Sequence, residues 1–161
     1  MKAEFRQAMR RMAATVSIVA AEHEGQRCGL AATSVVSVCV DPPTVLVCIN
    51  AGASAFPVVQ AARRFSVNIL GQDQRAIGDR FGRQHTQEER FAIGDWSCDE
   101  AGTPYLLNSQ ASLLCNVVQE LPYATHSIFI AEVLQVLAGD CVDPLLYADG
   151  RYGSVCLEAA A

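Results

Sequence analysis

Short apolar runs, each broken off by turn-forming residues, follow one another along most of this chain. The runs are rich in valine, isoleucine and threonine, a composition typical of β-strands. Strands are predicted at residues 15–21, 27–40, 44–49, 65–70, 112–120 and 127–137. Near the end, Asp149-Gly150 separates residues 145–147 from 152–155, and this dipeptide predicts a tight closing hairpin.

Two interruptions shape the first half of this pattern. Glu24-Gly25-Gln26 predicts a hairpin turn before the long run 27–40, which we expect to be bent or bulged around residues 32–37. Asp41-Pro42-Pro43 then ends the ladder, because neither proline has an N–H to donate. The next run, 44–49, is continuously apolar, which predicts a strand buried on both faces.

Four short helices are predicted around these strands. Apolar residues three and four positions apart predict a helix at 5–12, and Ser54 is expected to cap another at 55–62. A third helix is predicted at 74–81 and ends at Gly82. The fourth, at 86–91, carries Thr86 and Glu89 at the spacing of a capping box.

Many strands with few short helices indicate a mainly β fold, a β-barrel with peripheral short helices. A length of 161 residues favours a single domain spanning 1–161. The sequence has no strict alternation of strands and helices and no G-x-G-x-x-G segment. Both absences argue against a Rossmann fold.

Composition and charge narrow the possible partners. Hydrophobic residues make up 51% of the chain and charged residues 18%, so part of the apolar surplus is expected at a subunit interface. The net charge of −5 argues against nucleic acid or an anionic membrane as a partner. No apolar run is long enough to span a bilayer, and the first residues predict an amphipathic helix rather than a signal peptide. A cytoplasmic location is therefore expected.

The seven cysteines form no C-x-x-C pair and no metal-ligand spacing. They are Cys28, Cys39, Cys48, Cys98, Cys115, Cys141 and Cys156. We interpret them as small, mostly buried side chains in a reducing compartment. A zinc site or a nucleophilic cysteine is the alternative, and no metal ligand is assigned.

Polar residues gather at two places that could bind a ligand. Thr33, Ser34 and Ser37 lie in the bent part of the first long strand, where they either satisfy backbone groups or face a ligand. Asn50 and Ser54 lie between a buried strand and a helix. Free N–H groups at the start of the helix could bind an anion there, or the segment could be an ordinary capped loop.

Three further positions carry candidate chemistry. Arg83 follows a glycine and either reaches a phosphate or is solvated surface charge. His126 stands at the entrance of an apolar strand, where histidines are more often structural than catalytic. Glu132, within that strand, either faces solvent or pairs with an arginine.

The chain resembles the short-chain flavin reductases, the reductase components of two-component flavin monooxygenases of the 4-hydroxyphenylacetate and phenol hydroxylase type. The resemblance extends in order over nearly the whole chain. Its pieces are Phe5–Met9, Thr15–Val19, residues 29–38, 41–50, 54–58 and 65–70, Phe81-Gly82, Glu89-Arg90-Phe91, and residues 126–133. Gly29-Leu30 and Ile130-Ala131 depart from residues common in the family, as does the segment after Gly82.

The resemblance implies an FMN-binding split barrel that forms a homodimer and reduces exchangeable FMN or FAD with NADH or NADPH. Reduced flavin would then diffuse to a separate oxygenase component. The implied cofactor-binding residues are Thr33, Ser34, Val35, Ser37, Val38, Asn50, Ser54, Phe56, Gly82, Arg83 and Tyr152, with His126 beside the nicotinamide. Arg27, Arg63 and Arg75 are candidates for holding the 2′-phosphate of NADPH.

Such chemistry agrees with the absence of an obvious acid–base pair or triad, because the cofactors themselves carry the hydride. Backbone N–H groups between Ala31 and Ser37 are expected to bind the pyrimidine edge of the flavin. Two alternatives remain at this point. The barrel could hold FMN tightly and reduce a quinone, nitro compound or metal chelate, or it could be a non-catalytic flavin- or haem-binding module.

Overall fold

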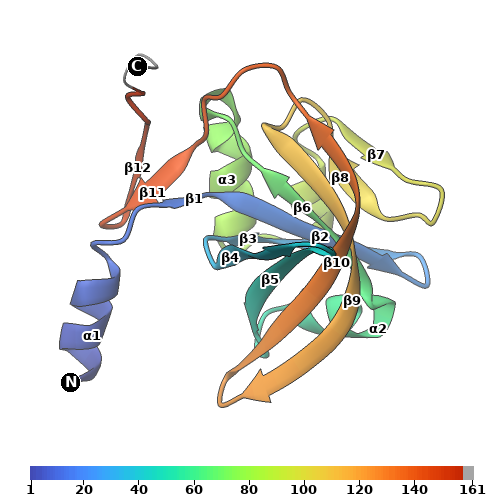
Figure 1. The fold of residues 1–161 in the computed structure, drawn as a ribbon, viewed down its shortest axis with the longest axis horizontal. Helices are drawn as coiled ribbons and strands as arrows, with labels where there is room; N and C mark the ends of the chain where they lie inside the picture. The colour runs from blue at the N-terminus through green and yellow to red at the C-terminus, as the bar shows by residue number, and fades with distance from the viewer. Residues whose placement is uncertain (158–161) are drawn as a thin grey trace.

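A computed structural model describes residues 1–157, and most of its strands belong to one antiparallel sheet (Figure 1). The strands of this sheet are β2 (Ser17–His23), β3 (Gln26–Ala32), β4 (Val35–Val40), β5 (Pro43–Asn50), β6 (Arg64–Ile69), β9 (Ala111–Tyr123) and β10 (His126–Ala138). Their order across the sheet is β3-β2-β6-β9-β10-β5-β4. The mainly β fold predicted from the sequence is confirmed.

The sheet is strongly curled. β3 and β4 occupy its opposite edges, yet only Thr33 and Ser34 separate them along the chain. Two residues span only about 7 Å, so the two edges must come together, as they do in Figure 1. The hydrogen bond from Cys48 N to Ser34 O, 3.3 Å, extends the β4–β5 ladder into this connection.

Smaller strands and helices complete the fold. β1 (Ala14–Thr15), β11 (Leu146–Ala148) and β12 (Arg151–Gly153) form a second sheet, and β7 (Trp96–Cys98) pairs with β8 (Pro104–Leu106). The helical elements are α1 (Lys2–Met9), α2 (Phe56–Ala62), η1 (Gln72–Gln74), α3 (Arg75–Gly82) and α4 (Gln87–Phe91). None of the helices within residues 1–157 is long and apolar enough to cross a membrane.

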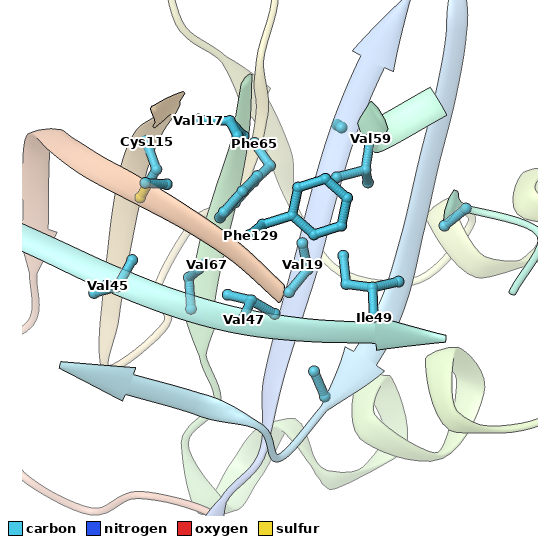
Figure 2. Packing of buried hydrophobic residues seen from close by; sticks show 14 of the residues in the cluster. Val19, Val45, Val47, Ile49, Val59, Phe65, Val67, Cys115, Val117 and Phe129 are labelled. Atoms are coloured by element: carbon cyan, nitrogen blue, oxygen red, sulfur yellow. The ribbon is translucent and has the colours of Figure 1, made fainter. Parts of the chain in front are cut away.

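Two hydrophobic clusters pack on the opposite faces of β2. Val19 points into the first cluster, inside the curl, with Val47, Phe65 and Phe129, and α2 adds Val59 (Figure 2). Ile18 and Ala20 point into the second cluster, which α3 and α4 cover with Phe81 and Phe91. The apolar run in this strand reflects burial on both faces.

Several sequence predictions are confirmed with shifted boundaries. The strands predicted at 65–70, 112–120 and 127–137 are present, and β9 and β10 each extend to 13 residues. The closing hairpin turns at Asp149 and Gly150, whose φ values of 49° and 77° suit a tight two-residue turn. The capping box of α4 is also present, with Glu89 N donating to Thr86 Oγ1 at 3.2 Å.

Four details of the prediction are wrong. The run 27–40 is two strands rather than one, because the chain crosses between sheet edges at Thr33 and Ser34. β5 is not buried on both faces, since its outward residues Leu46 and Cys48 are only half-buried. Ser54 does not cap α2, whose N-cap is Ala55. The first helix begins at Lys2 and ends at Met9.

Candidate functional site

A cavity of about 640 Å³ lies between the end of β3, helix α3 and the β11–β12 hairpin. This volume is in the range of ligand-binding pockets. β3 and the residues next to it contribute Ala31, Ala32 and Thr33, and Val16 adds an apolar patch. The remaining lining residues are Arg75, Gly78, Asp79, Gly82 and Arg83 at α3, and Tyr147, Gly150, Arg151 and Tyr152 in the hairpin.

The cavity borders the free edge of β3. The backbone N–H and C=O of Gly29 both point away from β2. The N–H donates to Gln87 Oε1 at 2.9 Å, and the C=O accepts from Arg90 at 2.6 Å. Peptide groups alternate in direction along a strand, so those of Ala31 point the same way as those of Gly29. Ala31 lines the cavity. The strand therefore presents a backbone donor and acceptor to a ligand there.

Two side chains of α4 hold this edge in place. Gln87 also donates to Ser54 Oγ at 3.1 Å, so it joins β3 to the loop that follows β5. Arg90 donates a second hydrogen bond, to the Arg83 carbonyl at 3.0 Å. Burial lowers the pKa of the Arg90 guanidinium from its ordinary value. α4 thereby fixes both the β3 edge and the backbone that carries Arg83.

Gly29 lets helix α3 lie close against this strand. A Cβ atom at Gly29 would stand 2.6 Å from Phe81 Cε1, well inside van der Waals contact. Phe81 is buried against Phe91 and Trp96, with ring centroids 5.3 and 5.4 Å away. The aromatic cluster cannot retreat easily, so this glycine sets the distance between α3 and the edge of the cavity.

The far wall of the cavity is built around Tyr152. The Arg75 guanidinium lies over the Tyr152 ring at 4.9 Å, and the Tyr147 ring meets it edge-on at 5.5 Å. The Tyr152 hydroxyl donates to Asp79 Oδ1 at 3.4 Å, and the same oxygen pairs with Arg83 at 3.3 Å. Burial and the nearby Asp79 carboxylate raise the pKa of Tyr152.

The hairpin that carries Tyr152 is joined to the N-terminal helix region. Arg10 Nε pairs with Asp149 Oδ1 at 3.2 Å, Arg10 also donates to the Asp149 carbonyl at 3.1 Å, and Asp149 N donates to the Arg10 carbonyl at 2.7 Å. Helix α1 itself has no buried residue and exposes Phe5 and Met9. In Figure 1 it stands apart from the sheet, beside this hairpin.

A second group of polar residues lies where strands β5 and β10 meet. Asn50 and His126 are register partners across these strands. Asn50 Oδ1 accepts from Gly52 N at 2.8 Å, and His126 Nδ1 lies 2.9 Å from Thr125 Oγ1. The backbone of Ala51, the residue after Asn50, donates to the Thr125 carbonyl at 2.9 Å, which holds the ends of the two strands together.

Comparisons with known proteins identify the family. The flavin reductase like domain model matches residues 9–155. The chain belongs to the flavin reductase family. It is 37% identical over 154 residues to the FMN reductase (NADH) RutF of Variovorax paradoxus, a match that covers 96% of this chain and 86% of that protein.

Other relatives of this flavin reductase domain are components of oxygenase systems. The reductase component of the FADH2-dependent resorcinol hydroxylase of Rhizobium sp. is 37% identical, over 92% of this chain and 84% of the relative. The styrene monooxygenase flavin reductase of Pseudomonas putida S12 matches with a TM-score of 0.86 at 28% identity, over 97% of this chain and 99% of that structure. The expected resemblance is therefore confirmed.

The structure brings only part of the predicted site together in the reductase domain. Thr33, Gly82, Arg83 and Tyr152 line the cavity. Ser54 does not line the cavity but accepts a hydrogen bond from Gln87, which also binds the Gly29 N–H of β3. Asn50 and His126 form the pair at the ends of β5 and β10.

The other predicted cofactor residues do not line the cavity. The Ser34 hydroxyl donates to the Cys48 carbonyl at 2.8 Å, which is the backbone-satisfying alternative considered for it. Val35 begins β4, and Ser37 and Val38 lie exposed further along that strand. Phe56 packs edge-on against Phe129 in the core, 5.9 Å between centroids.

Sequence reasoning missed several residues of the cavity wall, above all Asp79, Tyr147 and Arg151. Arg75, one of the three candidates for binding the 2′-phosphate of NADPH, lines the cavity. The other two candidates lie elsewhere: Arg27 stacks over the Phe91 ring at 4.1 Å, and Arg63 donates to the Val117 carbonyl.

The cysteines differ in burial within the described chain. All seven cysteines are free, and burial raises the pKa of Cys28 to about 11 and that of Cys115 to about 12. Cys39, Cys98, Cys141 and Cys156 are exposed, so the expectation of mostly buried cysteines is wrong. Within residues 1–157 no three His, Cys, Asp or Glu side chains are grouped as metal ligands.

Proposed function

We propose that this protein is an NADH-dependent flavin reductase that releases reduced FMN or FAD to a separate oxygenase component. The observation that carries the proposal is one cavity in which a free strand edge and several guanidinium groups lie together, in a chain of the flavin reductase family. Flavins combine a flat ring that has an amide-like edge with an anionic phosphate tail. The two ends of the cavity offer partners for both parts.

The residues present fit such a ligand. The Ala31 peptide groups and the Thr33 side chain would bind the polar edge of the ring, as a strand binds its neighbour. Val16 and Ala32 supply apolar surface, and Arg83 would pair with the terminal phosphate of the ribityl chain. When bound, the flavin accepts the hydride of the reduced nicotinamide, so the protein supplies orientation and a dry environment.

Exchange of the flavin is part of the proposal. The Arg83 side chain is 73% exposed and already pairs with Asp79, so an incoming phosphate competes with a carboxylate for it. Exposed ion pairs contribute little to the free energy of folding. The Arg83–Asp79 pair weakens the binding of a phosphate to Arg83, because the phosphate must displace the carboxylate. A dissociation constant of about 1 µM, or about −8 kcal/mol, suits a flavin that must leave.

His126 is proposed to orient the nicotinamide carboxamide without acting as an acid. His126 is the register partner of Asn50, at the start of β10 and the end of β5. Both side chains are exposed. They can therefore meet a nucleotide that approaches the flavin from outside the cavity.

The decisive experiment follows NADH absorbance at 340 nm with purified protein and added flavin. Rapid oxidation that rises with FMN or FAD concentration and saturates is expected. NADH should be preferred to NADPH, as the names of the relatives suggest. Flavin that copurifies in stoichiometric amount and turns over only with a quinone or nitro acceptor would favour the tight-binding alternative. Bound flavin or haem without NADH oxidation would favour the non-catalytic module.

We also propose that the protein works as a homodimer. Val36, Leu46 and Ile130 are partners on neighbouring strands and form an apolar row on the outer side of the sheet. Val36 is 53% exposed and lies on an edge strand, an arrangement that soluble proteins usually cover. A second copy offers the same uncharged row, so the two can pair around a two-fold axis.

The dimer is tested by sedimentation velocity. Leu46→Lys places a charge in the centre of the row and is expected to give monomers. Val142→Lys, at a position that is 72% exposed outside the row, is the matched control and should leave the wild-type species. A wild-type monomer at micromolar concentration would contradict the proposal.

We place the protein in the reducing cytoplasm. Four of its free cysteines, Cys39, Cys98, Cys141 and Cys156, are exposed. Exposed thiols are oxidised readily in secretory compartments, whereas cytosolic reductants keep them free. Fractionation of cells that express the protein tests this placement.

A further inference from the structure

We propose that helix α1 of one protomer packs on strands β4 and β10 of a second copy of this chain. The inference rests on the proposed homodimer and adds a second contact to its central row of Val36, Leu46 and Ile130. It assigns one occupant to two apolar surfaces that the single chain leaves exposed, the face of α1 and the outer residues of these two strands.

Helix α1 carries an apolar stripe that nothing in its own chain buries. Phe5, Met9 and Met12 are four and three positions apart, and helical hydrogen bonds continue past Met9, so the three side chains share one face. All three are exposed, Phe5 by 66%, and no residue of α1 is buried. A helix of eight residues is barely stable alone in water. Its apolar face therefore needs a surface that covers it.

The base of this helix is fixed while its body stands free. Arg10, the C-cap of α1, binds Asp149 through both its side chain and its backbone, which attaches the end of the helix to the β11–β12 hairpin. The rest of the helix lies apart from the large sheet (Figure 1). The apolar stripe is thus presented to another molecule.

Strands β4 and β10 carry the surface that would receive the helix. Both strands pair with β5, and both contribute to the proposed dimer row, through Val36 and Ile130. A stable interface takes about 20–30 residues from each side, so a row of three residues needs further contact area. The same two strands supply it with four more exposed apolar side chains, Val38, Val40, Leu134 and Val136.

The two surfaces carry opposite charge. Residues 1–12 hold four of the chain's 12 basic residues and only one of its 17 acidic residues. The receiving strands carry or border Asp41, Glu132 and Asp140, and none of these three forms an ion pair within residues 1–157. Complementary charge steers association and disfavours wrong partners. A second copy therefore offers α1 both apolar cover and carboxylates for its basic side chains.

Sedimentation equilibrium tests whether the helix contributes to the dimer. Phe5→Glu combined with Met9→Glu should raise the dissociation constant of the dimer at least tenfold, because two large apolar side chains no longer bury their surface. Gln7→Glu is the matched control, since it adds the same charge on the opposite face of α1 and should leave the dissociation constant unchanged. Circular dichroism and melting curves verify that the variants are folded.

A crosslinking experiment identifies the receiving surface. Cys39 is exposed on β4 between Val38 and Val40, so it reports on this part of the strand. Met9→Cys treated with a short bismaleimide should give a product of dimer mass in which position 9 is joined to Cys39. Mass spectrometry of the linked peptides separates it from links between native cysteines, and Met9→Cys combined with Cys39→Ser should lose it. The same link at monomer mass would overturn the inference, because α1 would then cover its own chain.

Vesicles of phosphatidylserine and phosphatidylcholine test the other surface that a basic amphipathic helix can bind. The wild type is expected to stay in the supernatant when the vesicles are sedimented. Vesicle binding that is lost in the Phe5→Glu, Met9→Glu variant would assign α1 to a lipid surface and overturn the inference.

Failure of the inference can be distinguished from failure of the proposals on which it rests. A wild-type dimer that the double variant does not weaken, or that gives no link between position 9 and Cys39, rejects the inference and leaves the homodimer standing. A wild-type monomer rejects both. None of these measurements depends on NADH oxidation, so the flavin reductase activity is tested separately.

Discussion

Arg90 donates a hydrogen bond of 2.6 Å to the carbonyl of Gly29, and this contact fixes an edge strand from outside the sheet. Edge strands leave backbone groups without partners, and a protein must satisfy or cover them. Here the same guanidinium also binds the Arg83 carbonyl. One buried cation therefore connects the strand that borders the cavity to the loop that carries a phosphate-binding candidate.

Arg90→Ala should destabilise the protein by about 2–3 kcal/mol, because it leaves two carbonyls without a charged donor in a buried position. Arg90→Lys should recover only part of this loss, since an ammonium cannot reach both acceptors in the fork geometry. Urea unfolding followed by circular dichroism measures the effect. An unchanged midpoint in Arg90→Ala would show that these hydrogen bonds contribute no net stability.

Gly29→Ala should cost about 1–3 kcal/mol, because the added methyl overpacks a rigid aromatic cluster. Its Cβ would lie 2.6 Å from Phe81 Cε1, so α3 would have to move away from β3. The matched control is Gly153→Ala, where nothing lies within 4 Å of the new Cβ. Thermal melting of both variants tests the difference, and equal melting temperatures would contradict the close approach.

His126→Ala is expected to raise KM for NADH several-fold and to leave flavin affinity unchanged, if the imidazole orients the nicotinamide. The side chain contributes a hydrogen bond to substrate, about 1 kcal/mol. His23→Ala, at the end of β2 away from Asn50, is the control. Steady-state kinetics with varied NADH, and fluorescence titration with FMN, separate the two affinities. An unchanged KM removes His126 from the site.

Local patterns were sufficient to predict most elements of the fold. The capping box at Thr86 and the turn at Asp149 depend on residues within a few positions of each other, so their chemistry is visible in the sequence. The division of the run 27–40 into two strands depends instead on contacts between distant parts of the chain. Nothing within the run shows that Ala32 and Val35 belong to opposite edges of one sheet.

The cavity was predicted less well because its walls come from distant parts of the chain. Arg75 and Arg151 line the same cavity, and the segments that carry them are joined where Leu145 N donates to Leu70 O at 2.8 Å and Leu70 N donates to Val16 O at 2.9 Å. These backbone contacts join three segments and carry no side-chain signal. Of the residues implied by the family resemblance, Gly82 and Tyr152 line the cavity, whereas those on β4 do not.

Thiol labelling should divide the cysteines by burial. With a pKa of about 11, Cys28 is ionised in only about one molecule in a thousand at pH 8, and Cys115 in fewer still. Cys39, Cys98, Cys141 and Cys156 are exposed and should react rapidly with iodoacetamide in the native protein. Peptide mass spectrometry identifies the labelled sites, and labelling in urea is the control. Rapid native labelling of Cys115 would contradict its burial.

The Arg64–Asp99 ion pair should make stability depend on pH. Arg64 pairs with Asp99 Oδ2 at 2.5 Å and with Thr103 Oγ1 at 2.8 Å, which attaches the β7–β8 hairpin to β6. Burial acts to raise the pKa of Asp99, but hydrogen bonds from Arg64 and Thr103 outweigh it, so the pKa is lowered. The folded state thus binds a proton less readily than the unfolded chain.

It follows that the stabilisation from Asp99 is present above the ordinary aspartate pKa, about 4, and is lost as the pH falls through the lower pKa of the folded state. Asp99→Asn should lower stability at pH 6 and have a smaller effect at pH 3, because the Asp99 carboxyl of the unfolded wild-type chain is largely protonated at pH 3. Urea unfolding at both pH values measures this difference. Asp73→Asn, on η1 away from this ion pair, is the control for a change of one charge. An equal loss of stability at pH 6 and pH 3 would mean that Asp99 acts through packing rather than through its charge.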